Sequence, residues 1–517
     1  MNTIPKNFNF VYDLVFIFFL NIIIAFIISK TFVPEEDAAI LFRYSENLSL
    51  SGIISYNEFG LKSEGATDFL WMIILALFNY LGFNTFFYAI LINLTSLLFF
   101  SLIIVNFFEA EKKEFYIIYF IHFLFNFTWA SLFGFSVLFV HLILLLSILS
   151  FIRNEVKYFL FFSFLGTLTR PDFILFVGPL AIYLFFKKYS FKVLLIYSFY
   201  TLIGFLYFMW RYNYFDMLFP LPYYIKSQWI LFDNLGWGKQ LIICLPALGV
   251  LLFIKLKKII NEQNIVLILG AIIIPTLYYT NQILYQNVGN RFYFFYITIF
   301  FIMIYKINLH KKFLNNKIFI ICLVGLISLF LNIFKNNLYP FNQNFFLKKE
   351  NNKFIYNKIN SPVVKFSRTL RTIKNNIEIA TTEAGLVPYY SGVKTIDLFG
   401  LNTKKFARNP AGGKYLYDNN FDLIIINTGQ SGTTCDGLNK LYIKSRSELM
   451  KNFNKRSANW SEFTLQLMAG IKNDKFKAYL FPYYSNKVNT FFFINTESLE
   501  FNFLKEEIEK YSNECVY

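Results

Sequence analysis

The chain has 517 residues and a mass of 61.2 kDa; 56% of its residues are hydrophobic, only 16% are charged, and its mean hydropathy is +0.45. Soluble domains carry about 25% charged residues, so this composition excludes an ordinary soluble enzyme and indicates a polytopic α-helical membrane protein. The net charge of +17 does not indicate a nucleic-acid partner, because the basic residues sit in short loops between apolar runs.

The first apolar run, residues 10–29, lacks a small-residue cleavage site before Lys30, so we expect a retained anchor in the lipid bilayer rather than a cleaved signal peptide. Runs of comparable hydrophobicity recur along the first two thirds of the chain. Together they predict about eleven transmembrane spans. The further spans are expected near residues 86–107, 115–130, 134–152, 158–169, 171–186, 192–210, 239–254, 263–280, 292–305 and 317–334.

The composition changes near Lys335, where charged residues, Asn and Ser become more frequent and the apolar runs shorten. The segment FDLIIIN at 421–427 is typical of a buried strand. We therefore predict a transmembrane module at 1–334 and a separate soluble α/β domain at 335–517.

The run at 68–83 decides the topology, because counting it as a span reverses the side of every later loop. The loops predicted for one side carry 14 Lys and Arg residues against five on the other, which places the Lys-rich loops in the cytoplasm. With Lys6 also inside, 68–83 must be an amphipathic or re-entrant helix that does not cross. The prediction is a cytoplasmic amino end, one large first external loop at 31–85, and an extracytoplasmic tail.

The four cysteines form no CxxC motif that would indicate a zinc or redox site. Cys435 and Cys515 could form a disulfide only if the tail is extracytoplasmic.

Three adjacent acids, Glu35, Glu36 and Asp37, follow the first span directly. Like charges so close together destabilise one another unless they meet a cation, or unless one has a raised pKa and serves as a general base. The alternative is that they are solvated residues at the end of a span, or the first residues of a helix.

Further charged residues fall on the same predicted external side as the three acids. They are Arg170, Arg211, Asp216, Lys226 and Arg291. A single arginine at the end of a span is often explained by snorkelling. Several on one face suit recognition of a lipid-borne phosphate, because guanidinium groups match phosphate oxygens.

An ordered set of motifs resembles a known family. It comprises E-D-A-x-I-x-x-R-Y-x-x-N-L at 36–48, Y-N at 56–57, E-G-x-T-x-x-L-W at 64–71, T-R-P-D at 169–172, Y-x-D-x-x-x-P-x-x-Y-Y-x-K at 214–226, R-F at 291–292, and EAGLVPYYSGVKTIDLFGLN at 383–402. The set looks like the terminal arabinofuranosyltransferase-like branch of the GT-C glycosyltransferases. The resemblance covers nearly the whole chain and implies a GT-C type fold.

The resemblance implies transfer of a sugar, such as the pentofuranose arabinofuranose, from a polyprenyl-phosphate donor to an extracytoplasmic glycan, lipid-linked glycan or glycoprotein. A carboxylate would deprotonate the acceptor hydroxyl while cations stabilise the departing phosphate. It assigns Asp37 as the base and Glu36 as its partner, or both as ligands of Mg²⁺ or Mn²⁺. Arg291, Arg211 and Lys226 would bind the donor phosphate. Substrate contacts are expected from Arg43, Glu64, Arg170, Asp216, Tyr223, Tyr224, Glu383 and Asp397.

The chain departs from the family pattern at several positions. Glu36-Asp37 replaces the usual Asp-Asp pair, the segment GFSV at 134–137 lacks the acid of a Gly-x-Glu-Thr-like turn, and Asn402 stands where Asp is common. These departures leave the identities of the sugar and the acceptor open.

The rival function is a polytopic lipid or sugar transporter or flippase. Such a protein should carry ionisable residues near the bilayer midplane, whereas here they gather at the external ends of the spans. A receptor or assembly scaffold would leave the three acids without a role. The chain has no GxGxxG motif or P-loop, which disfavours a nucleotide-sugar donor, and His122, His141 and His310 lack metal-site spacing.

Overall fold

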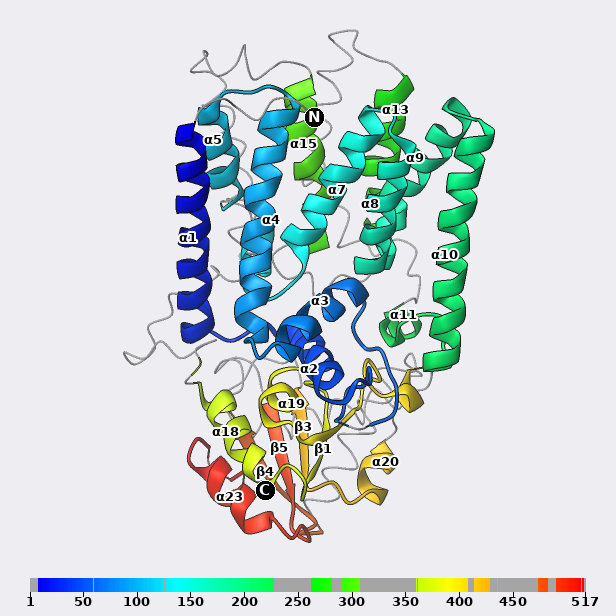
Figure 1. Cartoon of the computed structure of the whole chain (residues 1–517). Helices are drawn as coiled ribbons and strands as arrows, with labels where there is room; N and C mark the ends of the chain where they lie inside the picture. The colour runs from blue at the N-terminus through cyan, green and yellow to red at the C-terminus, as the bar shows by residue number, and fades with distance from the viewer. Residues whose placement is uncertain are drawn as a thin grey trace.

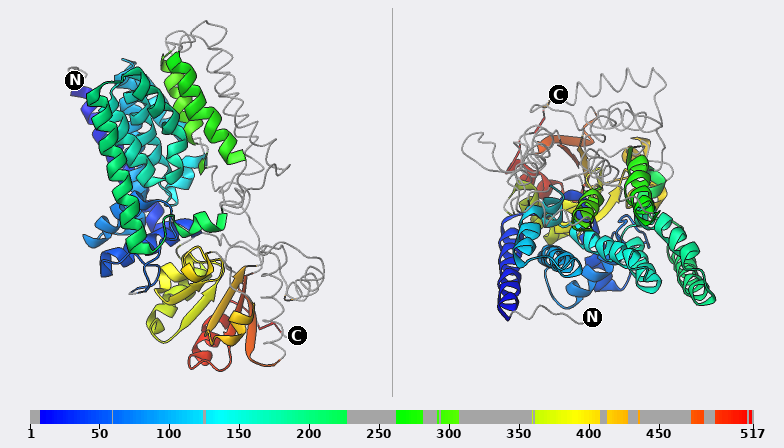
Figure 2. Two further views of the ribbon diagram at one scale, coloured as in Figure 1. Left: turned by 90° about the vertical axis from the view of Figure 1, so that its right-hand side faces the viewer. Right: turned by 90° about the horizontal axis from the view of Figure 1, so that it is seen from above.

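The computed structural model places a helical bundle at one end and a sheet domain at the other, with two helices of the first loop between them (Figure 1). The side view in Figure 2 shows the sheet domain beyond one end of the bundle. The structure describes residues 8–58, 60–123, 126–226, 262–280, 291–292, 294–306, 359, 361–407, 413–427, 435, 473–481, 490–512 and 514–515. The domain boundary predicted near 335 lies outside these residues.

The bundle helices follow the apolar runs of the sequence. They are α1 (Phe8–Thr31), α4 (Thr85–Phe107), α5 (Lys112–His122), α6 (Asn126–Leu132), α7 (Val137–Ile152), α8 (Val156–Thr169), α9 (Ile174–Lys187), α10 (Phe191–Phe215), α13 (Glu262–Ile268), α14 (Ile274–Thr280) and α15 (Phe294–Lys306). A π-helical segment, Leu269–Ile273, joins α13 to α14. The spans predicted at 239–254 and 317–334 lie outside the described residues.

Among the described residues, three helices are long and apolar enough to cross a membrane: Val11–Thr31 within α1, α4, and α10. Polar caps set the start of two of them. The Asn84 side chain accepts a hydrogen bond from the Phe87 N–H at 2.9 Å, and that of Ser190 accepts one from the Val193 N–H at 3.3 Å. Most apolar side chains of α10 are exposed, as expected of a helix that faces lipid.

The first loop contributes α2 (Glu36–Ser51) and α3 (Phe69–Tyr80), which lie between the bundle and the sheet domain (Figure 1). α2 ends at Gly52, whose φ of 70° is favourable for glycine and whose N–H donates to the Leu48 carbonyl at 2.9 Å. With 12 residues, α3 is about 18 Å long and too short to cross a hydrocarbon core of about 30 Å.

The sheet domain contains a five-stranded mixed sheet in the order β2-β1-β3-β5-β4. Its strands are β1 (Glu378–Thr381), β2 (Lys394–Asp397), β3 (Leu423–Asn427), β4 (Phe476–Phe481) and β5 (Thr490–Asn495). β1 pairs in parallel with β2 and β3, and β5 pairs antiparallel with β3 and β4. The strand predicted at 421–427 is therefore confirmed as β3.

The helices of the sheet domain are α18 (Pro362–Leu370), α19 (Leu386–Ser391), α20 (Gly413–Asp418) and α23 (Phe501–Glu509). Apolar side chains pack on both faces of the sheet. Phe366 of α18 contacts the rings of Phe481 and Phe492 on one face, while Phe491 and Phe493 belong to the core on the other. A C-terminal α/β domain is thus confirmed.

A disulfide joins Cys435 to Cys515. This is the pair that the sequence allowed for an extracytoplasmic tail. Disulfides persist in oxidising compartments outside the cytosol, and the location of the tail stays a prediction.

Candidate functional site

The three acids lie where the chain enters α2. Glu35 has extended backbone angles (φ −67°, ψ 154°) and precedes the first helical residue, Glu36. Its N–H donates to the Phe133 carbonyl at 3.1 Å, and its carbonyl accepts from the Ala39 N–H at 2.8 Å. The acids therefore sit at the helix amino terminus, where the helix dipole favours negative charge.

Asp37 forms an ion pair with Arg291, with 2.8 Å between Oδ2 and Nη2. Arg291 is only 7% exposed, and its guanidinium carbon lies 3.8 Å from the centre of the Phe135 ring. Its Nη1 has no hydrogen-bond partner among the residues that the structure describes. A buried donor of this kind costs free energy unless a ligand satisfies it, so Arg291 can bind an anion beside the acids.

Glu36 links the first loop to the sheet domain. Its two carboxylate oxygens accept hydrogen bonds from the backbone N–H groups of Gly385 (2.6 Å) and Leu386 (3.1 Å), at the start of α19. A Cβ at Gly385 would overlap the carbonyl oxygen of Glu36, so this close approach requires glycine. The structure thus gives Glu36 a docking contact with the sheet domain, and its role beside Asp37 stays a prediction.

Glu35 is the acid for which the sequence predicted no role. No hydrogen bond to its carboxylate is found within the described part of the chain. Burial, followed by repulsion from Asp37 and Glu36, raises its pKa to about 7, although Arg291 opposes the shift. A carboxylate with such a pKa is suited to accept a proton near neutral pH. The run of three acids was the only signal for it in the sequence.

The acids face the carboxyl ends of the parallel strands in the sheet domain. The loop after β1 reaches Glu36 through Gly385, and its Ala384 carbonyl accepts a hydrogen bond from the Tyr56 hydroxyl. The end of the parallel strands is where α/β sheets bind ligands. The site is therefore composite. The first loop contributes the acids, the bundle contributes the guanidinium of Arg291, and the sheet domain contributes the loop after β1 that contacts Glu36.

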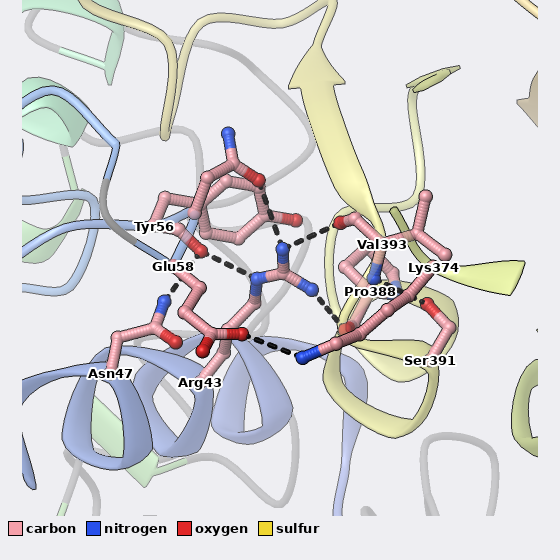
Figure 3. A network of polar contacts seen from close by, with 9 residues as sticks. Arg43, Asn47, Tyr56, Glu58, Lys374, Pro388, Ser391 and Val393 are labelled. Carbon is pink, nitrogen blue, oxygen red and sulfur yellow. Dashed lines mark hydrogen bonds and ion pairs between the residues drawn. The ribbon is translucent and has the colours of Figure 1, made fainter. Parts of the chain in front are cut away.

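Arg43 of α2 was predicted to contact substrate, but the structure uses its guanidinium to join the first loop to the sheet domain (Figure 3). Its Nε donates to the Tyr56 carbonyl at 2.5 Å, and its Nη2 donates to Asn57 Oδ1 at 2.9 Å and to the Val393 carbonyl at 2.7 Å. Its Nη1 donates to the Pro388 carbonyl. Arg43 is 4% exposed and all three nitrogens are engaged, so its contacts in the structure are structural, and a substrate contact stays a prediction.

Arg211 and Glu64, predicted to bind donor phosphate and substrate, form an ion pair with each other. Both side chains are almost fully buried, at 3% and 2% exposed. Arg211 also donates to the Leu218 carbonyl at 3.0 Å and to the Tyr207 hydroxyl at 3.1 Å. The pair ties the end of α10 to the first loop, and its ligand contacts stay predictions.

Arg170 lies near Arg291, with the Phe292 ring in contact with both guanidinium groups. It forms two hydrogen bonds with Asp172, at 3.1 and 2.8 Å, and the Tyr279 hydroxyl donates to the same carboxylate at 2.5 Å. The guanidinium of Arg170 lies 4.8 Å from the centre of the Phe292 ring, and that of Arg291 lies 5.3 Å from it. Asp172 and Tyr279 therefore hold Arg170, and the Phe292 ring lies next to both Arg170 and Arg291. Neither this ring contact nor the role of Tyr279 was predicted from the sequence.

Asp397, predicted to contact substrate, organises the loop after β2 instead. It is fully buried and accepts hydrogen bonds from the Phe399 N–H and from both the backbone N–H and the side-chain amide of Asn402, each at 2.9 Å. Burial raises the pKa of Asp397 to about 6, although these hydrogen bonds oppose the shift. Asn402, at the position where the sequence departs from the family pattern, is thus part of this loop structure.

Of the remaining predicted residues, Asp216 ends α10 with a left-handed φ of 56° and forms an ion pair with Lys404 at 2.8 Å. Tyr223 and Tyr224 lie on α11 (Leu221–Lys226), where the Tyr223 ring contacts Phe219 at 4.5 Å. Glu383 is half-buried two residues before Gly385. The side chain of Lys226 lies outside the described part of the structure.

We expect Glu64→Gln to lower the free energy of unfolding by about 3–5 kcal/mol, because it leaves the Arg211 charge buried without a partner. The double variant Glu64→Gln/Arg211→Leu should recover part of that loss, since it removes both charges. Thermal unfolding of the purified protein measures both effects. Strictly additive losses would contradict the pairing.

Comparison with known proteins identifies one family model, described as a domain of unknown function (DUF8728), which matches residues 355–477. The match covers much of the sheet domain and assigns no activity. No curated protein and no solved structure matches the chain.

Proposed function

We propose that the protein is a membrane glycosyltransferase that moves a sugar, such as the pentofuranose arabinofuranose, from a polyprenyl-phosphate donor to an extracytoplasmic glycan, lipid-linked glycan or glycoprotein. The main support is the ion pair of Asp37 with the buried Arg291, beside Glu35 and at the end of an apolar bundle. The order of the sequence motifs supports the same assignment.

The chemistry of the transfer needs a cation where the donor phosphate leaves. The phosphate gains negative charge as its bond to the anomeric carbon breaks, so a preplaced cation stabilises the transition state more than the bound donor. Arg291 meets this need because its buried guanidinium offers Nη1 beside the acids. Guanidinium groups bind phosphate oxygens with favourable geometry.

The transfer also needs a proton acceptor. The acceptor hydroxyl oxygen forms the new bond to the anomeric carbon, the phosphate leaves with the electrons of the old bond, and the hydroxyl proton must pass to a base. Asp37, the predicted base, is engaged in the ion pair with Arg291. We therefore assign proton acceptance to Glu35 and the orientation of Arg291 to Asp37.

The proposed arrangement has about eleven spans, a cytoplasmic amino end and an external sheet domain. The three helices long enough to cross a membrane, the loop charges and the Cys435–Cys515 disulfide support it. A lipid donor can enter such a bundle laterally, whereas a nucleotide sugar is confined to the cytoplasm.

Impermeant thiol labelling of spheroplasts tests this topology in a background in which Cys244 and Cys322 are replaced by serine. Cysteines placed at two highly exposed positions, Leu61 of the first loop and Leu499 of the sheet domain, are expected to react. A cysteine at the exposed Lys188, in a Lys-rich loop, is expected to stay unlabelled until the cells are lysed. The reverse pattern would refute both the topology and the function.

The function itself is tested with purified protein and an acceptor extract from the native membrane. One reaction receives a synthetic polyprenyl-phosphate arabinofuranose and the other receives the matching nucleotide sugar. Transfer from the lipid donor alone is expected, and Arg291→Ala should slow it by about 3 kcal/mol of barrier, comparable to the loss of one preorganised electrostatic contact. Transfer from the nucleotide sugar alone would exclude the proposed donor.

A further inference from the structure

The sequence resemblance predicted that Glu36 and Asp37 bind a divalent cation. The contacts of these two carboxylates bear on that prediction. Mg²⁺ and Mn²⁺ prefer several oxygen ligands in near-octahedral geometry, usually one or two carboxylates together with water and substrate phosphate. To bind such an ion, the carboxylates of Glu36 and Asp37 must point toward one common position, each with an oxygen available for the metal. Their hydrogen bonds and ion pairs in the structure show whether these oxygens are available.

Glu36 presents its carboxylate to the sheet domain. Both of its oxygens accept hydrogen bonds from backbone N–H groups, those of Gly385 at 2.6 Å and Leu386 at 3.1 Å. A metal ion that bound this carboxylate would compete with the two hydrogen bonds that attach α19 to α2. Binding a metal would thus weaken the contact between the first loop and the sheet domain.

Asp37 already has a cation as its partner. The guanidinium of Arg291 is 2.8 Å from Oδ2, and Arg291 remains charged at any physiological pH. The arginine is held in place by the Phe135 ring at 3.8 Å and by Phe292, whose ring also contacts Arg170. A second cation at Asp37 would be repelled by the charge of this fixed guanidinium.

We infer that Arg291 takes the place of a divalent metal ion in this site, so that the transfer proceeds without a metal. This inference rests on the proposed function. The acceptor oxygen bonds to the anomeric carbon as the carbon–oxygen bond to the donor phosphate breaks. The lipid phosphate leaves with the electrons of that bond, against Arg291 Nη1, and the acceptor proton passes to Glu35. No step requires a further cation or co-reactant.

Metal binding is measured on purified protein in lipid nanodiscs by electron paramagnetic resonance of added Mn²⁺, without donor or acceptor. The acid cluster of the wild-type protein is expected to bind no Mn²⁺. The amount of Mn²⁺ bound per protein should therefore be the same for wild type, Asp37→Asn and Glu35→Gln. One bound Mn²⁺ per protein that is lost in either variant would overturn the inference. Circular dichroism of both variants verifies that a lost site does not reflect unfolding.

Turnover provides the second readout. Transfer from the synthetic lipid donor is expected to be unchanged after chelation with EDTA and after addition of Mg²⁺ or Mn²⁺. Loss of activity on chelation, restored by one of these ions, would overturn the inference while leaving the proposed function intact. If no transfer occurs from the lipid donor under any metal condition, the proposed function fails, and the Mn²⁺ measurement still decides whether the cluster binds a metal.

Discussion

Replacing Glu35 with glutamine is expected to lower transfer by about 10²–10⁴-fold, the usual loss when a general base is removed. The amide keeps the size and polarity of the side chain but cannot accept the acceptor proton. Initial rates with the lipid donor measure the effect. The matched control is Glu506→Gln, on the exposed surface of α23, which should retain wild-type activity.

The pH profile separates Glu35 from its neighbours. Its pKa is raised to about 7, and the base must be ionised to act, so wild-type activity should rise with pH through about 7 and then level off. Asp37 and Glu36 raise this pKa and Arg291 lowers it. Asp37→Asn removes one repelling charge, so the rising limb should move to lower pH. A limb that persists unchanged in Glu35→Gln would assign the base to another residue.

Replacing Arg43 with alanine is expected to lower the free energy of unfolding by about 3–5 kcal/mol, near the upper end for single substitutions. The change removes four hydrogen bonds that the buried, charged guanidinium donates to acceptors of the first loop and the sheet domain. Hydrogen bonds to charged groups contribute about 1.5–3 kcal/mol each, and the desolvation of the guanidinium offsets part of that gain. Arg43→Lys should also destabilise, because an ammonium cannot reach all these acceptors at once. Thermal unfolding of the purified variants provides the measurement.

A matched control lies in the same interface. Lys374 forms an ion pair with Glu58 at 2.8 Å, and both side chains are 33% exposed. Solvent-exposed pairs contribute about 0–1 kcal/mol, so Lys374→Ala should have little effect. Equal stability losses for Arg43→Ala and Lys374→Ala would contradict the structural role of Arg43.

The sequence predicted the helices and β3 well because long apolar runs and a short β-branched run leave few alternatives. The structure places α3 between the bundle and the sheet domain, and its predicted position relative to the membrane stays a prediction. The structure also brings together Asp37 and Arg291, which are 254 positions apart and which the sequence predicted to lie on one side of the membrane. These features follow from hydrophobicity and charge, which the sequence displays directly.

The roles of Arg43, Arg211 and Asp397 could not be predicted in the same way. The partners of Arg43 and Asp397 are mainly backbone carbonyls and N–H groups, which have no sequence signature. Arg211 is paired with Glu64 through a tertiary contact between distant segments. The distinct role of Glu35 depends on its position just before α2 and on the burial of its carboxylate. A charged residue in a motif thus indicates where a site lies, but it does not show whether that residue binds a ligand or stabilises the fold.

The docking contacts also explain why the acids need the sheet domain. Glu36 and Arg43, both on α2, hydrogen-bond to residues of the sheet domain around α19. These bonds fix the helix whose first turn carries Asp37. Preorganisation of this kind is what electrostatic catalysis requires.

The central claim is that a lipid-borne phosphate binds Arg291 beside Glu35. The most direct measurement is an electron cryomicroscopy structure of the purified protein with a synthetic polyprenyl phosphonate carrying arabinofuranose on a carbon linkage, which cannot transfer its sugar. We expect a phosphonate oxygen within hydrogen-bonding distance of Arg291 Nη1 and the anomeric carbon on the side that faces Glu35. A phosphonate bound at another place, with no contact to Arg291 Nη1, would refute this binding mode.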